Sequence, residues 1–365
     1  MRVLITGICG FVGSTLAFEL IRQSGVSQII GIENFSRGGS ETNRRWLLNQ
    51  GISVISGDIR NASDVDSLPQ ADVVIDAAAN PSVLAGVDGK TSSRQLIENN
   101  FYGTINLLEY CKRHSAAFTL LSTSRVYSIP KLAQLKMTVK ENAFVPDSNQ
   151  VFPAGISAKG VTEAYNTSPP VSLYGSSKFA SEHLAIEYGL SFGFPVWINR
   201  CGVLAGPGQF GHPAQGIFAY WIHSFREGKP LRYFGFGGSG YQVRDCLHPR
   251  DLVPILNLQF EEGLTENKPC IVNISGGIEN SMSLAQLTSW CSRRYPDSPT
   301  AKLLADSCNA GSPNPDRPFD IPWMVLDSRL AQRTWNWNVS TPVSEVLEQI
   351  ADYADQHPNH LLLSH

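Results

Sequence analysis

A tyrosine and a lysine four positions apart are the side chains of this sequence that are best placed for acid–base chemistry. Tyr174 and Lys178 bracket the run Tyr-Gly-Ser-Ser-Lys, and residues 172–192 have the pattern of a helix. Positions i and i+4 of a helix share one face. An ammonium group beside a phenol favours the phenolate and so lowers the tyrosine pKa from about 10. Such a pair can act as a general base near neutral pH, although the spacing alone also arises by chance in many helices.

A hydroxyl group is expected close to this pair. Residues 117–122 (Ala-Phe-Thr-Leu-Leu-Ser) predict a strand, and residues 122–124 (Ser-Thr-Ser) place hydroxyl groups at its carboxyl end. That edge is where open parallel sheets bind ligands. A hydroxyl, a phenolate and an ammonium group together can remove a proton from a sugar alcohol while a nicotinamide cofactor takes the hydride.

The first thirteen residues predict a cradle for a pyrophosphate. Residues 3–5 (Val-Leu-Ile) are typical of a strand buried on both faces, and Gly7, Gly10 and Gly13 follow before a helical pattern begins. The glycines allow close approach, and the free N–H groups and the helix dipole face the anion. The spacing G-x-x-G-x-x-G is one residue off the best-known dinucleotide fingerprint. A glycine-rich turn of any βαβ unit is therefore the alternative interpretation.

The ends of two further predicted strands favour a dinucleotide. Residues 28–32 (Gln-Ile-Ile-Gly-Ile) end in Glu33, where a carboxylate can hold the adenosine ribose hydroxyls. Its charge would repel a 2′-phosphate, which favours NAD over NADP, although the nearby Arg37 weakens this preference and Glu33 could also be a solvated turn residue. The small residues 77–79 (Ala-Ala-Ala) would let phosphate and ribose pass close to the backbone, or would only allow tight packing.

The order of the elements predicts an α/β fold, a Rossmann-type doubly wound parallel sheet with a smaller C-terminal α/β substrate domain. Strand-like runs also occur at 52–56, 72–76 and 195–199, and a helix is predicted at 94–114. Because a helix-length segment follows each strand, the crossovers are expected to be right-handed.

Two domains and a tail are expected. Residues 128–170 are rich in proline and predict a long loop with short helices over the active site, since loops of this length are more often functional than idle. Two later helices are predicted at 284–293 and 342–355. The expected units are an NAD-binding domain (1–200), a mainly substrate-binding domain that possibly returns segments to the first (201–356), and a frayed tail (357–365).

Composition excludes several classes of protein. The 365 residues carry a net charge of −3 and no long basic run, which gives no reason to propose nucleic acid or an anionic membrane as partner. No apolar stretch approaches the length of a membrane span, and no signal peptide is expected. The 7 cysteines are scattered without a C-x-x-C, so neither a metal site nor a disulfide framework is predicted. Reduced thiols in a cytoplasm fit best.

The chain resembles the extended short-chain dehydrogenase/reductase family, and within it the nucleotide-sugar epimerases, over nearly its whole length. The segments that carry the resemblance are Thr6–Gly13 (TGICGFVG), Gly57–Ile59 (GDI), Asn100–Thr104 (NFYGT), Ser122–Tyr127 (STSRVY), Tyr174–Lys178 (YGSSK), Asn199–Gln209 (NRCGVLAGPGQ) and Gln242–Leu252 (QVRDCLHPRDL). The resemblance implies an enzyme with NAD as its cofactor and a nucleotide diphosphate sugar as its substrate; we also expect a homodimer.

The resemblance also implies roles for individual residues. Tyr174 would be the base, Lys178 its partner and Thr123 the third catalytic member, while Arg244 and Arg317 would clamp the substrate diphosphate, as the forked guanidinium suits phosphate oxygens. Arg317 could also be a surface residue of a proline-rich loop. The expected cofactor-binding set is Gly7, Gly10, Phe11, Val12, Gly13, Glu33, Asn34, Ser36, Arg37, Asp58, Ile59, Ala77, Ala78, Ala79, Asn100, Ser122, Tyr174, Lys178 and Cys201. The expected substrate-binding set is Thr123, Asn199, Gln209, Gln242, Arg244 and Arg317.

Within the family, the sugar nucleotide 4,6-dehydratases carry an Asp-Glu pair directly after the catalytic threonine, because elimination of water needs that extra acid and base. Here Ser124 and Arg125 stand at these positions, which argues against dehydratase chemistry. The motifs are most similar to those of CDP-tyvelose (CDP-paratose) 2-epimerases, followed by UDP-glucose 4-epimerases. A one-way sugar nucleotide dehydrogenase or reductase is the remaining alternative among enzymes, and a cofactor-sensing or RNA-binding scaffold without activity is the alternative from another class.

Overall fold

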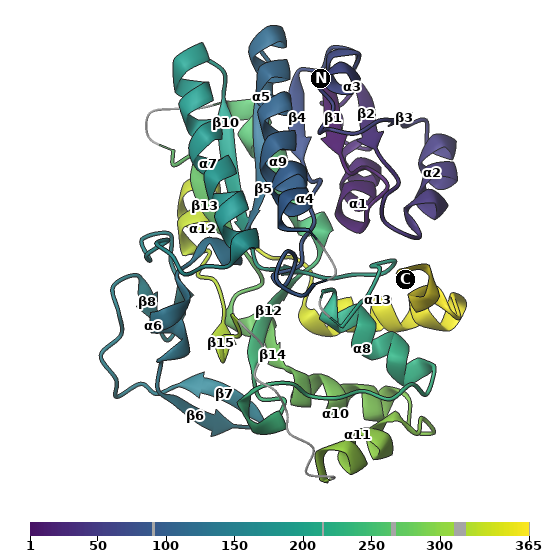
Figure 1. Cartoon of the computed structure of the whole chain (residues 1–365), viewed down its shortest axis with the longest axis vertical. Coiled ribbons are helices and arrows are strands. Elements are labelled where there is room, and N and C mark those ends of the chain that lie inside the picture. The colour runs from purple at the N-terminus through teal and green to yellow at the C-terminus, as the bar shows by residue number, and fades with distance from the viewer. Residues whose placement is uncertain (90–91, 214, 264–267, 310–318, 365) are drawn as a thin grey trace.

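The largest sheet is formed by seven parallel strands in the order β13-β10-β5-β4-β1-β2-β3 (Figure 1). The computed structural model describes residues 1–89, 92–213, 215–263, 268–309 and 319–364. The strands of this sheet are β1 (Arg2–Thr6), β2 (Gln28–Glu33), β3 (Ser53–Ser56), β4 (Val73–Asp76), β5 (Ala117–Thr123), β10 (Val196–Cys201) and β13 (Ile271–Ile274). The strand order reverses between β1 and β4, so the sheet is doubly wound, as the sequence predicted.

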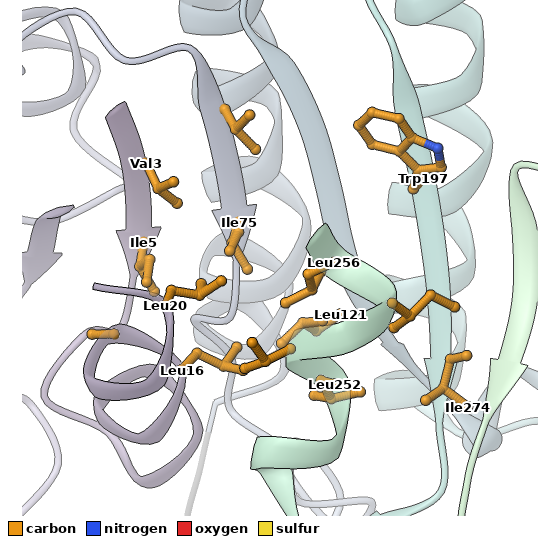
Figure 2. Close-up of a cluster of buried hydrophobic side chains, with 14 of the residues drawn as sticks. Val3, Ile5, Leu16, Leu20, Ile75, Leu121, Trp197, Leu252, Leu256 and Ile274 are labelled. Atoms are coloured by element: carbon orange, nitrogen blue, oxygen red, sulfur yellow. The ribbon is translucent and has the colours of Figure 1, made fainter. Parts of the chain in front are cut away.

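Helices cover both faces of this sheet because its strands are apolar on both sides. Val3 and Ile5 of β1 contact one buried cluster, whereas Leu4 between them contacts the other. The first face is covered by α1 (Phe11–Leu20), α9 (Leu252–Glu262) and α12 (Arg329–Trp335). Figure 2 shows side chains of α1 and α9 beside those of the strands. The second face is covered by α3 (Ala62–Asp66), α5 (Gly103–His114) and α7 (Leu173–Phe192). The helix α2 (Ser40–Asn49) flanks β3.

The helix predicted at 94–114 is present but is not uniform. It consists of α4 (Ser93–Ile97), a π-helical turn (Glu98–Tyr102) and α5. Single π turns inside α-helices are often found at functional sites. Here the turn contains the buried Asn100, whose contacts are described below.

A smaller unit lies below the carboxyl edge of the large sheet in Figure 1. Its sheet is formed by β11 (Val203–Leu204), β12 (Val243–Leu247), β14 (Ser281–Ser283) and β15 (Trp323–Met324), with β12 pairing with each of the other three. Its helices are α8 (Ile217–Arg226), α10 (Leu284–Arg294), α11 (Thr300–Asn309) and α13 (Val343–Gln356). The chain passes between the units more than once, because β13 joins the large sheet after β12 has been completed in the small one.

The segment 128–170 differs from the predicted loop with short helices. It contains one short helix, α6 (Ile129–Ala133), but also two hairpins, β6 (Met137–Lys140) with β7 (Ala143–Pro146) and β8 (Ile156–Ser157) with β9 (Gly160–Val161). Each hairpin is anchored by contacts remote in sequence. The Val161 N–H donates to the Val325 carbonyl at 2.9 Å, and the Phe144 N–H donates to the Tyr241 carbonyl at 2.8 Å.

The expectation of a frayed tail is wrong for the part of residues 357–365 that the structure describes. Residues His360–Ser364 form a 3₁₀ helix, and His360 and Leu361 are buried. The His360 ring stacks on Phe210 and on His223, with ring centroids 5.3 and 5.1 Å apart. The tail is therefore fixed by aromatic packing. Short 3₁₀ helices connect other elements at Ser124–Val126, Phe236–Gly238, Pro249–Asp251 and Ile278–Asn280. None of the helices in the described part of the chain has the length and apolar character needed to cross a membrane.

Candidate active site

The turn between β1 and α1 has the form of an anion cradle. Gly7 has a positive φ of 61°, which favours glycine, and a side chain at Gly13 would collide with the Gly7 carbonyl. The Gly10 N–H donates to that carbonyl at 2.9 Å and closes the turn. Because no side chain caps α1, the N–H groups of its first residues, including Phe11 and Val12, are available to a ligand. The arrangement fits a pyrophosphate, as the sequence predicted.

The end of β2 presents a buried carboxylate beside this cradle. The Glu33 carboxylate accepts the N–H of Cys9 and that of Phe35, both at 3.1 Å. Burial raises the pKa of Glu33, and these N–H groups and the charge of Arg37 oppose the shift. The Arg37 guanidinium is itself directed elsewhere, because it donates to the Phe210 carbonyl at 2.9 Å. These contacts leave Glu33 as the charge that a ribose would meet, and they support NAD over NADP.

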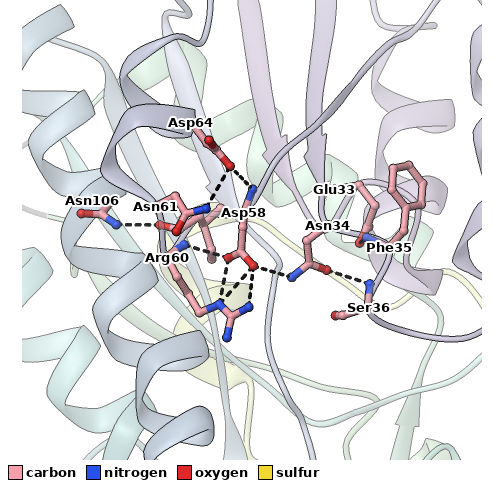
Figure 3. A network of polar contacts seen from close by, with 10 residues as sticks. Glu33, Asn34, Phe35, Ser36, Asp58, Arg60, Asn61, Asp64 and Asn106 are labelled. Carbon is pink, nitrogen blue, oxygen red and sulfur yellow. Dashed lines mark hydrogen bonds and ion pairs between the residues drawn. The ribbon is translucent and has the colours of Figure 1, made fainter.

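A polar network surrounds the ends of β2 and β3 (Figure 3). The Asn34 amide donates to Asp58 at 3.2 Å and accepts the Ser36 N–H at 3.0 Å. Asp58 also pairs with Arg60 at 2.6 Å, and the Ile59 carbonyl accepts the Asn106 amide at 2.7 Å. Burial alone would raise the pKa of Asp58, but the bonds from Arg60 and Asn34 lower it, so that this carboxylate stays charged. The predicted cofactor residues of these two loops thus form one preorganised rim.

The end of β4 is held close to the cradle by Thr6. The Thr6 hydroxyl accepts the N–H groups of Ala77 and Ala78 at 3.0 and 2.9 Å and donates to the buried Asp76 at 2.9 Å. A side chain at Gly7 would lie 3.1 Å from the Ala78 Cα atom. The small residues 77–79 therefore allow the loop after β4 to pack closely against the glycine turn. Because their side chains are short, a ligand could also approach the backbone of this loop.

Asn100 braces the site and does not offer a free amide to a cofactor. Its Oδ1 accepts the Asn80 N–H at 2.8 Å, and its Nδ2 donates to the Asn80 carbonyl at 3.1 Å and to Ser177 Oγ at 3.3 Å. The Asn100 carbonyl accepts the Ser181 hydroxyl at 2.9 Å. The π turn thereby ties the β4 loop to α7, which carries the proposed base. The predicted role of Asn100 on the cofactor side is thus one of positioning.

Thr123 and Tyr174 meet at the carboxyl end of β5, and Lys178 lies one turn further along α7. Ser172 caps α7 by accepting the Gly175 N–H at 3.1 Å, so the helix begins immediately before Tyr174. Burial raises the pKa of Tyr174, whereas a hydrogen bond with Thr123 lowers it. The lowered pKa that the sequence predicted is therefore wrong for the chain alone, because withdrawal of the phenol from water outweighs the stabilisation of the phenolate.

Lys178 is a buried ammonium group. Its exposed fraction is 2%, and within the described residues it has no hydrogen bond or ion pair of its own. Burial lowers its pKa, and the charges of Asp76, Cys201 and Glu182 oppose that shift. A buried cation without a partner is costly. We therefore expect a cofactor ribose or the Tyr174 phenolate to accept a hydrogen bond from the Lys178 ammonium group.

Arg200 and Glu182 form a buried ion pair that the sequence analysis did not identify, and Glu182 lies on α7, the helix that carries Tyr174 and Lys178. Arg200 donates to Glu182 at 3.1 and 2.6 Å, and Ser122 donates its hydroxyl to the same carboxylate. Arg200 also donates to Tyr127, whose hydroxyl donates to Asn273 at 2.7 Å. The Ser122 side chain is thus committed to Glu182 and not to a cofactor. The sequence feature that could have indicated this pair is the position of Glu182. It follows Lys178 by four residues and therefore lies on the same helix face, one turn further along.

A cavity of about 550 Å³ lies between the two units and is the proposed substrate pocket. Gln242 and Arg244 of the small unit line it, together with Arg125 from the large one. Arg244 pairs with Asp320 at 3.0 Å, and the Gln242 Nε2 donates to the Phe234 carbonyl at 3.0 Å. The Oε1 of Gln242 is buried and accepts no hydrogen bond from the described residues.

Of the predicted substrate residues, Thr123, Asn199 and Gln209 are not among those that line this pocket. Asn199 is fully buried, and its amide forms reciprocal hydrogen bonds of 3.0 and 2.9 Å with Gln259 of α9, so it is withdrawn from the substrate-binding set. Gln209 donates to the Leu204 carbonyl at 2.9 Å and is not among the residues that line the pocket. Cys201 is buried, and its thiol lies 3.4 Å from the Asn199 carbonyl. Arg317 lies outside the described residues.

A dinucleotide cradle, a Thr-Tyr-Lys group at the sheet edge and an arginine-lined pocket define a nicotinamide-dependent α/β enzyme. Residues 3–275 match the NAD dependent epimerase/dehydratase family, and the chain belongs to that family. The family resemblance, the fold class and NAD as the cofactor, all predicted from the sequence, are therefore confirmed.

The individual relatives include epimerases and a dehydratase of nucleotide sugars. The CDP-paratose 2-epimerase of Salmonella typhi is 28% identical over 97% of this chain and 99% of that protein. A dTDP-glucose 4,6-dehydratase of Salmonella typhimurium is 26% identical over 72% of this chain and 69% of its own length. A mutant of the UDP-glucuronic acid 4-epimerase of Bacillus cereus, solved with UDP-4-deoxy-4-fluoro-glucuronic acid and NAD, is 26% identical to this chain with a TM-score of 0.75. The match covers 98% of this chain and 99% of that one.

Proposed function

We propose that this chain is an NAD-dependent epimerase of a nucleotide diphosphate sugar. The observation that carries the proposal is the hydrogen bond of Thr123 with Tyr174 beside the turn of Arg125, which lines the pocket together with Arg244. The cradle suits a pyrophosphate, and the pocket offers cations to a diphosphate.

The residues divide the chemistry among them. Tyr174 as phenolate takes the proton from a ring hydroxyl, and the same phenol later returns it. Thr123 orients that exchange through its hydrogen bond to the tyrosine. Lys178 supplies positive charge that favours the phenolate over the phenol. NAD, held by the glycine cradle and Glu33, supplies a hydride acceptor that is regenerated in each turnover.

Similarity over the full length favours a 2-epimerase of the CDP-paratose type as the particular activity. Activity on UDP-glucose at the 4-position, or one-way oxidation or reduction of a sugar nucleotide, are the alternatives. Ser124 and Arg125 stand where a dehydratase carries its Asp-Glu pair, so elimination of water is not supported although a dehydratase is among the relatives.

The proposal includes a cytoplasmic homodimer. Six of the cysteines are free thiols, which suits a reducing compartment. Several apolar side chains are exposed on neighbouring helical segments, among them Ile97 of α4, Tyr102 of the π turn and Leu190 of α7. Packing α4 and α7 against the same helices of a second copy would remove this surface from water.

Product analysis together with cofactor accounting tests the proposal. Purified enzyme is incubated with CDP-paratose, UDP-glucose or UDP-glucuronic acid, and products are separated while absorbance at the reduced nicotinamide band is followed. An epimerase forms an isomer of unchanged mass and accumulates no stoichiometric NADH. Stoichiometric NADH would instead establish a one-way dehydrogenase. Equilibrium binding of NAD and NADP in parallel is expected to favour NAD, and a clear preference for NADP would contradict the role of Glu33.

A further inference from the structure

Arg125 is placed beside the proposed base by two separate contacts. It lies in the 3₁₀ helix Ser124–Val126, and its N–H donates to the Thr123 hydroxyl at 3.2 Å. A side chain at Gly175 would collide with the Arg125 carbonyl, so the start of α7 packs directly on this turn. The position of Arg125 relative to Thr123 and Tyr174 is therefore fixed by the backbone.

The Arg125 guanidinium lines the substrate pocket and forms no ion pair with the part of the chain that the structure describes. It donates to the Phe319 carbonyl at 3.3 Å, and among the described residues no carboxylate lies within ion-pair distance of it. Burial and the charge of Arg244 together lower the pKa of Arg125 to about 10, and the charge of Asp320 opposes that shift. A partly buried charge without an ion pair is unfavourable, so a ligand that supplies an anion here would stabilise it.

A second arginine is held next to the first. Arg244 donates to Asp320 at 3.0 Å, and Asp320 directly follows Phe319, whose carbonyl accepts Arg125. Phe319 has a positive φ of 66°, an uncommon conformation for a residue with a side chain. Two guanidinium groups are thus anchored by consecutive residues at one wall of the pocket. Among the described residues that line the pocket, Asp320 is the one carboxylate beside these two cations, so this lining carries a net positive charge.

We propose that Arg125 binds the sugar-side phosphate of the substrate, so that the ring carbon next to the anomeric carbon is presented to Tyr174. The proposal rests on the proposed function and deepens it. The sugar-side phosphate is attached through oxygen to the anomeric carbon. A cation fixed beside Tyr174 reaches that phosphate when the neighbouring carbon 2 lies at the base. When carbon 4 lies at the base, the phosphate is on the far side of the ring and Arg125 faces the substituent on carbon 5 instead.

Nucleotides without a sugar test the phosphate contact directly. Dissociation constants for CMP and CDP, and for UMP and UDP, are measured by calorimetry on the NAD-loaded enzyme and on Arg125→Gln. Loss of a charge-assisted contact should weaken diphosphate binding by about 10- to 100-fold and leave monophosphate binding unchanged. Arg113→Gln, which removes an exposed arginine of α5, is the control for net charge.

Other outcomes separate the failure of this inference from failure of the proposed function. Equal affinities of Arg125→Gln and wild type for CDP and UDP overturn the inference. Weakening confined to UDP-glucuronic acid also overturns it, because Arg125 would then bind a sugar carboxylate. If wild type binds none of the nucleotides, the proposed function itself fails. Arg125→Lys keeps the positive charge but loses the forked guanidinium group, so it should retain part of the CDP affinity. Retained affinity in this variant would show that the loss in Arg125→Gln does not come from a folding defect.

The configuration of the product tests the second half of the proposal. Nuclear magnetic resonance of the product formed from CDP-paratose or UDP-glucose identifies the inverted carbon. Inversion next to the anomeric carbon supports the assignment, and inversion at carbon 4 overturns it.

Discussion

The buried pair between Glu182 and Arg200 makes a quantitative prediction about stability. The two side chains are 0% and 5% exposed, and the Glu182 carboxylate accepts three hydrogen bonds from Arg200 at 3.1, 3.1 and 2.6 Å. Glu182→Gln keeps the volume but leaves the guanidinium without its anion. Breaking a buried pair in this way costs about 3–5 kcal/mol, because the remaining charge stays buried without compensation.

A double-mutant cycle isolates the pair. Glu182→Leu with Arg200→Met removes both charges, so the double variant should lose less stability than either single variant. Unfolding by urea at unchanged m gives the free energies. The matched control is Asp66→Asn, which breaks the exposed pair of Asp66 with Arg113 and should cost at most about 1 kcal/mol. A loss below about 1 kcal/mol in Glu182→Gln, or strictly additive losses in the double variant, would refute the reasoning.

The remaining predictions concern the base, the phosphate clamp and a buried histidine. Tyr174→Phe should lower turnover by about 10²–10⁴-fold while NAD content and fold stay intact, and a variant within a few-fold of wild type would show that the base is misassigned. Arg244→Ala should raise the KM for a nucleotide sugar by roughly 10–150-fold with unchanged NAD content. Arg244 pairs with Asp320 and not with Asp245 or Asp251. Lost thermal stability with an unaltered KM would show that this ion pair only stabilises the fold. Burial lowers the pKa of His223 to about 3, so the unfolded chain binds the extra proton below pH 6.5 and stability falls as the pH drops from there. Relative to His223→Phe, wild type should therefore lose about 2 kcal/mol of unfolding free energy between pH 7 and pH 5, and parallel stability curves for the two proteins would contradict this.

Local patterns were sufficient for the parts of the site that depend on neighbours in sequence. The strand and turn of residues 3–13 follow from an apolar run and the glycines after it, because those residues decide the backbone conformation by themselves. The placement of Tyr174 and Lys178 on one helix face follows from their spacing alone. Glu33 was correctly placed at the end of a strand, since the apolar run before it has a clear boundary.

Features that depend on distant parts of the chain were decided only by the tertiary structure. Asn199 stands in a motif that suggested substrate binding, but pairing of β10 with β5 and β13 turns its side chain toward Gln259. The hairpins within 128–170 form because Val161 and Phe144 find backbone partners more than ninety residues away. The tail is ordered by His223 and Phe210, which no pattern within the tail itself could indicate.

The pKa values of the site residues are also decided by the tertiary structure. Sequence spacing places an ammonium group near a phenol, but how far each pKa moves depends on how completely the fold withdraws Tyr174 and Lys178 from water. The cation that opposes the upward shift of the tyrosine is Arg125, which comes from another element. The sequence by itself determined which reactive groups the chain carries and on which local elements they lie, because those follow from short-range geometry. Only the tertiary structure decided which of them meet and how far each is buried, because burial and long-range pairing are properties of the packed chain as a whole.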